Sequence, residues 1–124
     1  MIKENVSWFY RIFATRKYVD FWNIPHILIG IIFGFIFFYF RLSLIFALIL
    51  TIVFAIAWEV YEHYYGTQET IQNQIFDIIS NVLGLLLFYL LVLKYNPTLT
   101  DFIITIIIFI VLSLLGRYAE SKLI

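Results

Sequence analysis

The segment FYFRLSL, residues 38–44, decides how this chain folds, because Arg41 is the only charged residue between Ile24 and Trp58. If the apolar stretch from Ile24 to Tyr65 formed one helix, it would be about 63 Å long at 1.5 Å per residue. That length is roughly twice the 30 Å hydrocarbon thickness of a bilayer. The chain must therefore reverse, and we expect one helix to end near Tyr39 and the next to begin near Ser43.

The composition excludes most classes of soluble protein. The 124 residues are 64% hydrophobic, 21% aromatic and 13% charged, which is far more apolar surface than a soluble domain of this size can bury. Eight basic and eight acidic side chains give a formal net charge of zero, so the basic surface of a nucleic-acid-binding protein is lacking. The absence of cysteine excludes disulfides and thiolate metal sites. No glycine-rich phosphate loop is found, so we expect neither a nucleotide nor a redox cofactor.

The apolar runs predict an all-α, polytopic membrane protein built as a four-helix transmembrane bundle. Asn23 and Pro25 fit the N-cap and the first turn of the first helix. A polar break at residues 66–74 and the segment Lys94-Tyr95-Asn96-Pro97 bound the third helix, and Thr98 or Thr100 is expected to cap the fourth. Within a bundle of residues 23–124, the predicted spans are residues 24–40, 43–64, 75–93 and 100–117.

Residues 1–22 and the distribution of cations bear on how the protein sits in the membrane. The sequence SWFYRIFATRKYVDFW, residues 7–22, mixes aromatic and basic residues, which predicts a short interfacial helix or a charged flank that anchors the first span. We expect that span to remain as a permanent anchor. With four spans, Arg41 and Lys94 lie on one side, and six cations lie on the other: Lys3, Arg11, Arg16, Lys17, Arg117 and Lys122. This asymmetry predicts a multi-pass plasma-membrane protein with both termini in the cytoplasm.

Polar side chains gather at the cytoplasmic ends of three predicted helices. In each of these helices, the polar side chains continue a stripe of small or weakly polar residues at helical spacing, such as Thr51, Ala55 and Glu59. Membrane helices pack closely along such stripes. We therefore expect six polar groups to face the interior of the bundle at one membrane face: His26, Glu59, Glu62, His63, Asp77 and Asn81.

Two arrangements would stabilise these groups, since a charged side chain at membrane depth costs about 2.5 to 3.5 kcal/mol and neighbouring carboxylates repel. In the first, a divalent metal is bound by Glu59 and His63 at i,i+4 and by Asp77, with Glu62 or His26 completing the shell. In the second, the two histidines and Arg117 balance the acids in a hydrogen-bonded network. Asn81 would orient its neighbours in either arrangement. Solvated helix ends explain Glu62, His63 or Asp77 taken singly, whereas Glu59 lies a full turn deeper.

A family resemblance follows from the same region. Trp58, Glu59 and Glu62 close one helix, and the segment DIISNVLG, residues 77–84, opens the next. This pattern resembles the VanZ-like family of small membrane proteins, in which an acidic helix end is followed by a D-x-x-x-N-x-x-G helix start. The resemblance covers residues 55–87, but Thr67-Gln68-Glu69-Thr70 stands where the family has an arginine and a further aspartate. It implies a bacterial or archaeal cell-envelope protein of a family associated with glycopeptide resistance.

Three functions remain open at this point. The first is an enzyme acting on a membrane lipid or a lipid-linked phosphate, with Glu59, His63 and Asp77 as its catalytic, metal-binding residues and Arg117 holding the phosphate. The second is an accessory protein that binds a polar headgroup without turnover, or whose polar cluster is structural. The third is a small proton or cation transporter unit, which four helices would form only as a homo-oligomer. The sequence favours a ligand or metal site and leaves turnover open.

Overall fold

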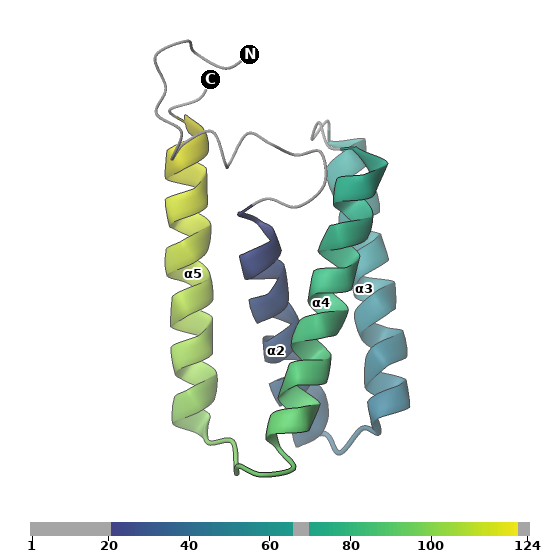
Figure 1. The fold of residues 1–124 in the computed structure, drawn as a ribbon, viewed down its shortest axis with the longest axis vertical. Helices are drawn as coiled ribbons and strands as arrows, with labels where there is room; N and C mark the ends of the chain where they lie inside the picture. Colours follow the sequence, from purple (N-terminus) through teal and green to yellow (C-terminus); the bar gives the residue numbers. More distant parts are fainter. Residues whose placement is uncertain (1–20, 66–69, 122–124) are drawn as a thin grey trace.

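A computed structural model of the protein describes residues 21–65 and 70–121, and these residues form four helices and no strand. The helices are α2 (Asn23–Tyr39), α3 (Leu44–Tyr64), α4 (Ile71–Leu91) and α5 (Leu99–Ser121). They run alternately up and down (Figure 1). The predicted all-α, four-helix fold is therefore confirmed. The interfacial helix predicted for residues 1–22 lies outside the described residues, apart from Phe21 and Trp22.

The distribution of exposed and buried side chains is the reverse of that in a soluble domain. Large apolar side chains on every helix face outward, and Ile45 is 70% exposed and Leu90 63%. The buried side chains are instead rich in polar groups, eight of which lie inside the bundle: Asn23, His26, Thr51, Glu59, Asn73, Asp77, Ser80 and Asn81. Such an arrangement is stable only where the surrounding solvent is apolar. The chain is a small helical membrane protein.

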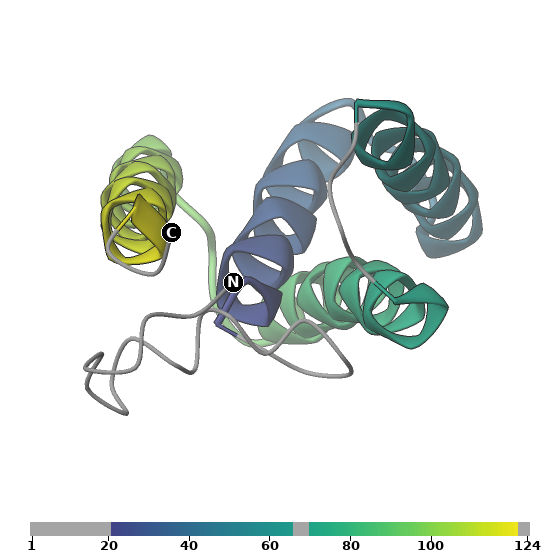
Figure 2. The ribbon, with the colours of Figure 1, turned by 90° about the horizontal axis from the view of Figure 1, so that it is seen from above.

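Helix length supports the same conclusion. Among the described residues, α3, α4 and α5 are each long and apolar enough to cross a bilayer. The remaining helix, α2, is apolar but has only 17 residues. At 1.5 Å per residue it is about 26 Å long, at the short end of the lengths that span a membrane. It is also the central helix, with α5 on one side and α3 and α4 on the other (Figure 2).

The turn between α2 and α3 lies where the sequence predicts the reversal. The amide of Leu42 donates to the carbonyl of Phe37 at 2.9 Å, and the amide of Arg41 donates to that of Phe38 at 2.9 Å. This is the Schellman pairing that ends many helices, and it places Arg41 at the left-handed position with φ of 58°. Glycine is the usual residue there, and a side chain in this conformation costs about 1 to 2 kcal/mol. Ser43 then caps α3, its Oγ accepting from the amide of Phe46.

Two other helix starts are defined by threonine caps. Thr70 Oγ1 accepts from the amide of Asn73, so α4 begins at Ile71, four residues before the predicted start of the third span. At α5, Thr98 and Asp101 exchange hydrogen bonds, each side chain accepting from the other residue's amide at 3.2 and 3.0 Å. This capping box selects Thr98 rather than Thr100. The additional first turn of α4 contains polar residues, and for this reason the apolar run in the sequence predicts a later start of the helix.

Helices α2 and α4 make the closest contact in the bundle. A Cβ atom added at Gly30 would overlap the backbone carbonyl oxygen of Asn81, and one added at Gly84 would overlap that of Ile27. The two backbones touch because neither glycine has a side chain, as in the small-residue interfaces of membrane helices. Toward the Arg41 end, the core becomes apolar around Phe37 and Leu85. At the opposite end, the same two helices enclose the buried polar side chains.

Candidate functional site

Three ionisable side chains converge inside the bundle from three different helices. His26 belongs to α2, Glu59 to α3 and Asp77 to α4, and they are 7%, 5% and 1% exposed. One ligand atom from each residue lies within 4.8 Å of those from the other two. An imidazole and two carboxylates at this spacing fit a single metal ion. We refer to His26, Glu59 and Asp77 as the ligand triad.

The ligand triad lies below the membrane face rather than on it. His26 is the fourth residue of α2, Asp77 is the seventh residue of α4, and Glu59 precedes the end of α3 by five residues. At 1.5 Å per residue, each lies about 5 to 9 Å inside the end of its helix. The carboxylates are therefore withdrawn from water, and ionising both without a counter-charge is unfavourable.

Asn81 orients the imidazole of the ligand triad. Its Nδ2 lies 3.1 Å from Nδ1 of His26 and donates to the backbone carbonyl of Asp77 at 3.0 Å. With Nδ1 held on the Asn81 side, Nε2 of His26 faces the Oδ2 atom of Asp77 at 3.6 Å. The amide thus fixes the orientation of the ring, so that Nε2 is the nitrogen that faces the carboxylate.

Asn23 also belongs to the site, although its position in the sequence predicts a different role. It was expected to cap the first helix, but the cap position is Trp22, and no side chain makes the capping hydrogen bond. Asn23 is instead the first residue of α2 and is buried. Its Nδ2 donates to Oδ1 of Asp77 at 3.2 Å and to Oγ of Ser80 at 2.9 Å. A buried amide with two acceptors on α4 is better satisfied there than at the end of its own helix.

The spacing along the helices contained a signal for these supporting residues. Asn23 precedes His26 by three residues, and Ser80 follows Asp77 by three, so each lies on the same helix face as its ligand. Asn73 precedes Asp77 by four and is 1% exposed. Extending the inward stripe by one turn in both directions would have found all three.

The remaining predicted site residues lie away from the ligand triad. Glu62 is half-buried and His63 is exposed, and neither belongs to the group of ligand atoms that converge with Glu59. His63 instead lines a groove between α3 and α4. Arg117 is exposed on α5, which contacts only α2 among the described helices, so the structure does not bring it to the triad.

The groove between α3 and α4 leads to the triad. It has a volume of about 400 Å³, and Glu59 forms part of its wall. His63 and Gln74 are its other polar residues, and the rest of the wall is apolar: Ile56, Val60, Ile71, Ile75 and Ile78. A ligand in this groove would meet Glu59 first, because His26 and Asp77 do not line it.

No family model, curated protein or solved structure matches this chain.

The charge of the triad suits a divalent cation. Two carboxylates carry two negative charges, and a neutral imidazole adds a nitrogen ligand without adding charge. A bound divalent ion would make the cluster neutral, which removes both the repulsion between the acids and the cost of charge at this depth. Mixed nitrogen and oxygen ligands favour Zn²⁺, Mn²⁺ or Fe²⁺ over Mg²⁺ and Ca²⁺, which prefer oxygen alone.

Proposed function

We propose that this protein binds a divalent transition-metal ion through His26, Glu59 and Asp77. The observation that carries the proposal is the convergence of these three buried side chains, from three helices, within 4.8 Å. Three protein ligands leave coordination positions open for water or a substrate oxygen. A metal in such a site polarises a phosphoryl or carbonyl oxygen, or activates a bound water.

The proposed ligand of the metal is the headgroup of a membrane lipid or a lipid-linked phosphate. The groove beside Glu59 supports this proposal, since its polar side chains accompany a wall of isoleucine and valine. An amphiphile would place its polar end toward Glu59 and its apolar part along this wall. The resemblance of residues 55–87 to the VanZ-like family suggests a role in cell-envelope metabolism or glycopeptide resistance, which we include in the proposal.

A second candidate is a hydrogen-bonded network without metal, and the position of Asn81 favours it. The Nδ2 group of Asn81 has two hydrogens, and its neighbours are the carbonyl of Asp77 and Nδ1 of His26. If both accept, the ring proton is on Nε2, where it faces Oδ2 of Asp77 rather than a metal. The polar cluster would then hold a shared proton and stabilise the bundle, or serve in proton or cation transfer.

Metal content distinguishes the two candidates. Protein purified in detergent after growth with Zn²⁺ or Mn²⁺ should contain about one ion per chain by elemental analysis. Glu59→Gln and Asp77→Asn should each lower that content at least about tenfold, because each replaces one of the two carboxylates with a neutral amide, a weaker ligand. Dialysis into acidic buffer should release the ion from the unmodified protein, since protons compete for the imidazole and carboxylates.

Asp101→Asn is the matched control, because it also neutralises one carboxylate but lies in the capping box of α5. It should retain the full metal content. Equal metal content in Glu59→Gln, Asp77→Asn and the unmodified protein would rule out the proposed site. A metal-free protein in which both substitutions change thermal stability would support the hydrogen-bonded network.

A further inference from the structure

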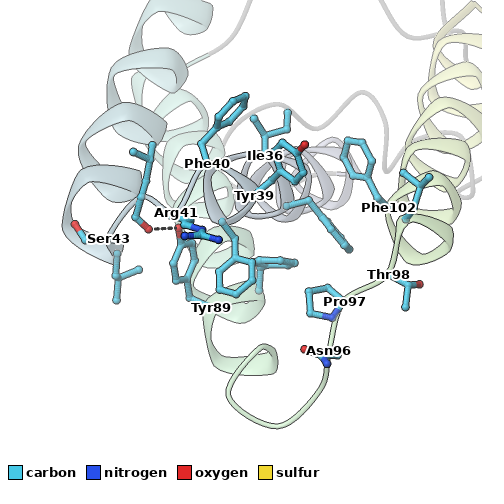
Figure 3. Close-up of a pocket in the computed structure, with 16 residues that line it drawn as sticks. Ile36, Tyr39, Phe40, Arg41, Ser43, Tyr89, Asn96, Pro97, Thr98 and Phe102 are labelled. Carbon is cyan, nitrogen blue, oxygen red and sulfur yellow. Dashed lines mark hydrogen bonds between the residues drawn. The ribbon is translucent and has the colours of Figure 1, made fainter.

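A second cavity lies at the opposite end of the bundle from the ligand triad. It has a volume of about 1180 Å³, above the usual range of about 300 to 1000 Å³ for small-molecule sites. It is bounded by the end of α2, the turn that follows, α4 and the segment leading into α5 (Figure 3). Its wall is mainly apolar and rich in aromatic residues, which include Phe35, Phe38, Tyr39, Phe88, Tyr89 and Phe102.

The arrangement of α5 keeps this cavity open. At this end, α5 approaches α2 through the rings of Phe102 and Phe35, whose centroids are 5.2 Å apart. It makes no contact with α4, which forms the other wall. The cavity is therefore an apolar groove between helices that faces the hydrocarbon region at the side and the membrane surface at the turn.

Arg41 is the only charged residue among those lining the groove. Its side chain lies beside Tyr89, whose hydroxyl donates to the carbonyl of Leu42 at 3.0 Å and so holds the turn against α4 (Figure 3). The guanidinium makes no hydrogen bond or ion pair to any residue in 21–65 or 70–121. One cation at the rim of an apolar groove is complementary to an amphiphile with one anionic end.

The backbone of Arg41 provides an independent observation. Its φ of 58° occupies the helix-ending position at which glycine is favoured. A non-glycine residue in this conformation costs free energy, which makes its side chain a candidate for a functional role. The Arg41 side chain lines the cavity, where an anionic group would meet it.

We propose that the groove binds one acyl chain of an anionic phospholipid, with the phosphate held by Arg41. Arginine binds phosphate through two parallel N–H donors, and the Tyr39 and Asn96 side chains at the rim supply further polar contacts for a headgroup. This site is separate from the ligand triad and does not depend on metal binding there.

Native mass spectrometry of the full chain in detergent provides the test. Phosphatidylglycerol and phosphatidylcholine with identical acyl chains are added in equal amounts, and the bound ratio is measured. The unmodified protein should retain phosphatidylglycerol several-fold over phosphatidylcholine. Arg41→Gly should abolish this preference while its melting temperature stays equal or rises, because glycine suits the turn. Arg41→Gln should abolish the preference as well, and Arg41→Lys should keep part of it.

Two further variants distinguish lipid binding in the groove from a general electrostatic attraction of anionic lipid to the protein surface. Lys94→Ala removes the other cation predicted on this side and should leave the preference unchanged. Ile36→Trp adds bulk to the groove wall and should lower binding of both lipids. The proposal is overturned if Arg41→Gly keeps the preference, if Lys94→Ala removes it, or if Ile36→Trp leaves lipid binding unchanged. It is also overturned if the unmodified protein is a dimer that these substitutions dissociate, because a second copy of the chain would then cover the groove.

Discussion

Asn81 shows how a single uncharged residue can organise a charged site. It is 4% exposed, and its amide joins the ring of His26 on α2 to the backbone of Asp77 on its own helix. The hydrogen bonds fix the relative position of two of the three triad residues. The hydrogen bond that this buried amide donates to the carbonyl of Asp77 is also a source of stability, since an unsatisfied polar group at this depth is costly.

Replacing Asn81 with leucine should lower metal affinity about 10- to 100-fold, the usual effect of losing an outer-shell neighbour, because the imidazole loses the contact that orients it. The two side chains have the same branched shape and number of heavy atoms, so the bundle should still form, with a loss of about 1 to 3 kcal/mol for the missing hydrogen bonds. Titration of metal into the dialysed protein would measure the affinity.

Ser80→Ala is the control for the Asn81 substitution. Ser80 Oγ contacts Asn23 and donates to the carbonyl of Phe76 at 2.8 Å, and it makes no hydrogen bond to a residue of the triad among the described residues. The metal affinity of the Ser80→Ala protein should stay within about threefold of that of the unmodified protein. Equal affinity for the Asn81→Leu protein would show that the imidazole is oriented by other contacts.

The pairing of α2 with α4 is the element that brings the site together. These helices are not neighbours in the chain, yet they make the most extensive contact in the bundle. Gly30 and Gly84 lie opposite each other in that contact, and Gly30 is one turn from His26 while Gly84 is one turn from Asn81. Any increase in the distance between the two backbones would therefore also separate His26 from Asp77.

Gly84→Ala should lower both the melting temperature and metal binding. The added methyl group would overlap the carbonyl of Ile27, which belongs to the backbone and cannot rotate away. Overpacking of this kind costs about 1 to 3 kcal/mol. Detergent melting curves and metal titration would measure the two effects.

Gly116→Ala is the matched control on α5. There the new methyl group would lie 2.9 Å from ring atoms of Phe21 and Trp22, which are side chains that can shift. Its effect on stability should be smaller, and metal binding should not change. If Gly84→Ala binds metal as well as Gly116→Ala does, close packing of α2 on α4 is not needed for the site.

Sequence patterns predicted the elements better than they predicted the contacts between them. The reversal at Arg41 was predictable because one arginine in a long apolar run marks a return to the membrane surface. The inward orientation of Glu59 was also predictable, since it continues the stripe of Ala47, Thr51 and Ala55, all of which are buried. A period of about four residues contains that information within a single helix.

Which of the polar residues would be buried and which exposed was not predictable in the same way. Glu59 and His63 occupy the same stripe in the sequence, but the structure buries the first and exposes the second. That outcome depends on where α4 crosses α3, which no local pattern contains. The position of α5 is a similar case: its sequence is apolar on all sides, so nothing in it indicated that only Gly116 and Ala119 would be buried.

At the scale of the whole molecule, the two ends of the bundle differ in character. One end encloses the ligand triad, and the other has the aromatic groove with Arg41 at its rim. The two features lie at opposite ends of a bundle in which three helices are suited to crossing a bilayer. The orientation with both termini in the cytoplasm stays a prediction from the distribution of lysine and arginine, as does assembly into a homo-oligomer.

The absence of native cysteine allows a direct test of orientation. Single cysteines introduced at Asn96, in the α4–α5 connection, and at Ser121, at the end of α5, are both exposed and lie at opposite ends of the bundle. In intact bacterial cells, a membrane-impermeant maleimide should label the cysteine at position 96. The cysteine at position 121 should react only after the cells are opened.

The unmodified protein controls for background labelling, since it has no thiol. Labelling of position 121 but not of position 96 in intact cells would reverse the assigned orientation and place the triad on the outer face. Labelling of both positions would contradict an arrangement in which α5 crosses the membrane.

The order of the ligands along the chain also has a consequence for biosynthesis. His26 reaches the translocon first, Glu59 follows on the return helix, and Asp77 with Asn81 arrives only with α4. A nascent chain arrested before residue 71 therefore contains two of the three triad residues and lacks the helix that supplies the third. Because α5 supplies none of them, only the first three of the four described helices need to be made before the triad is complete.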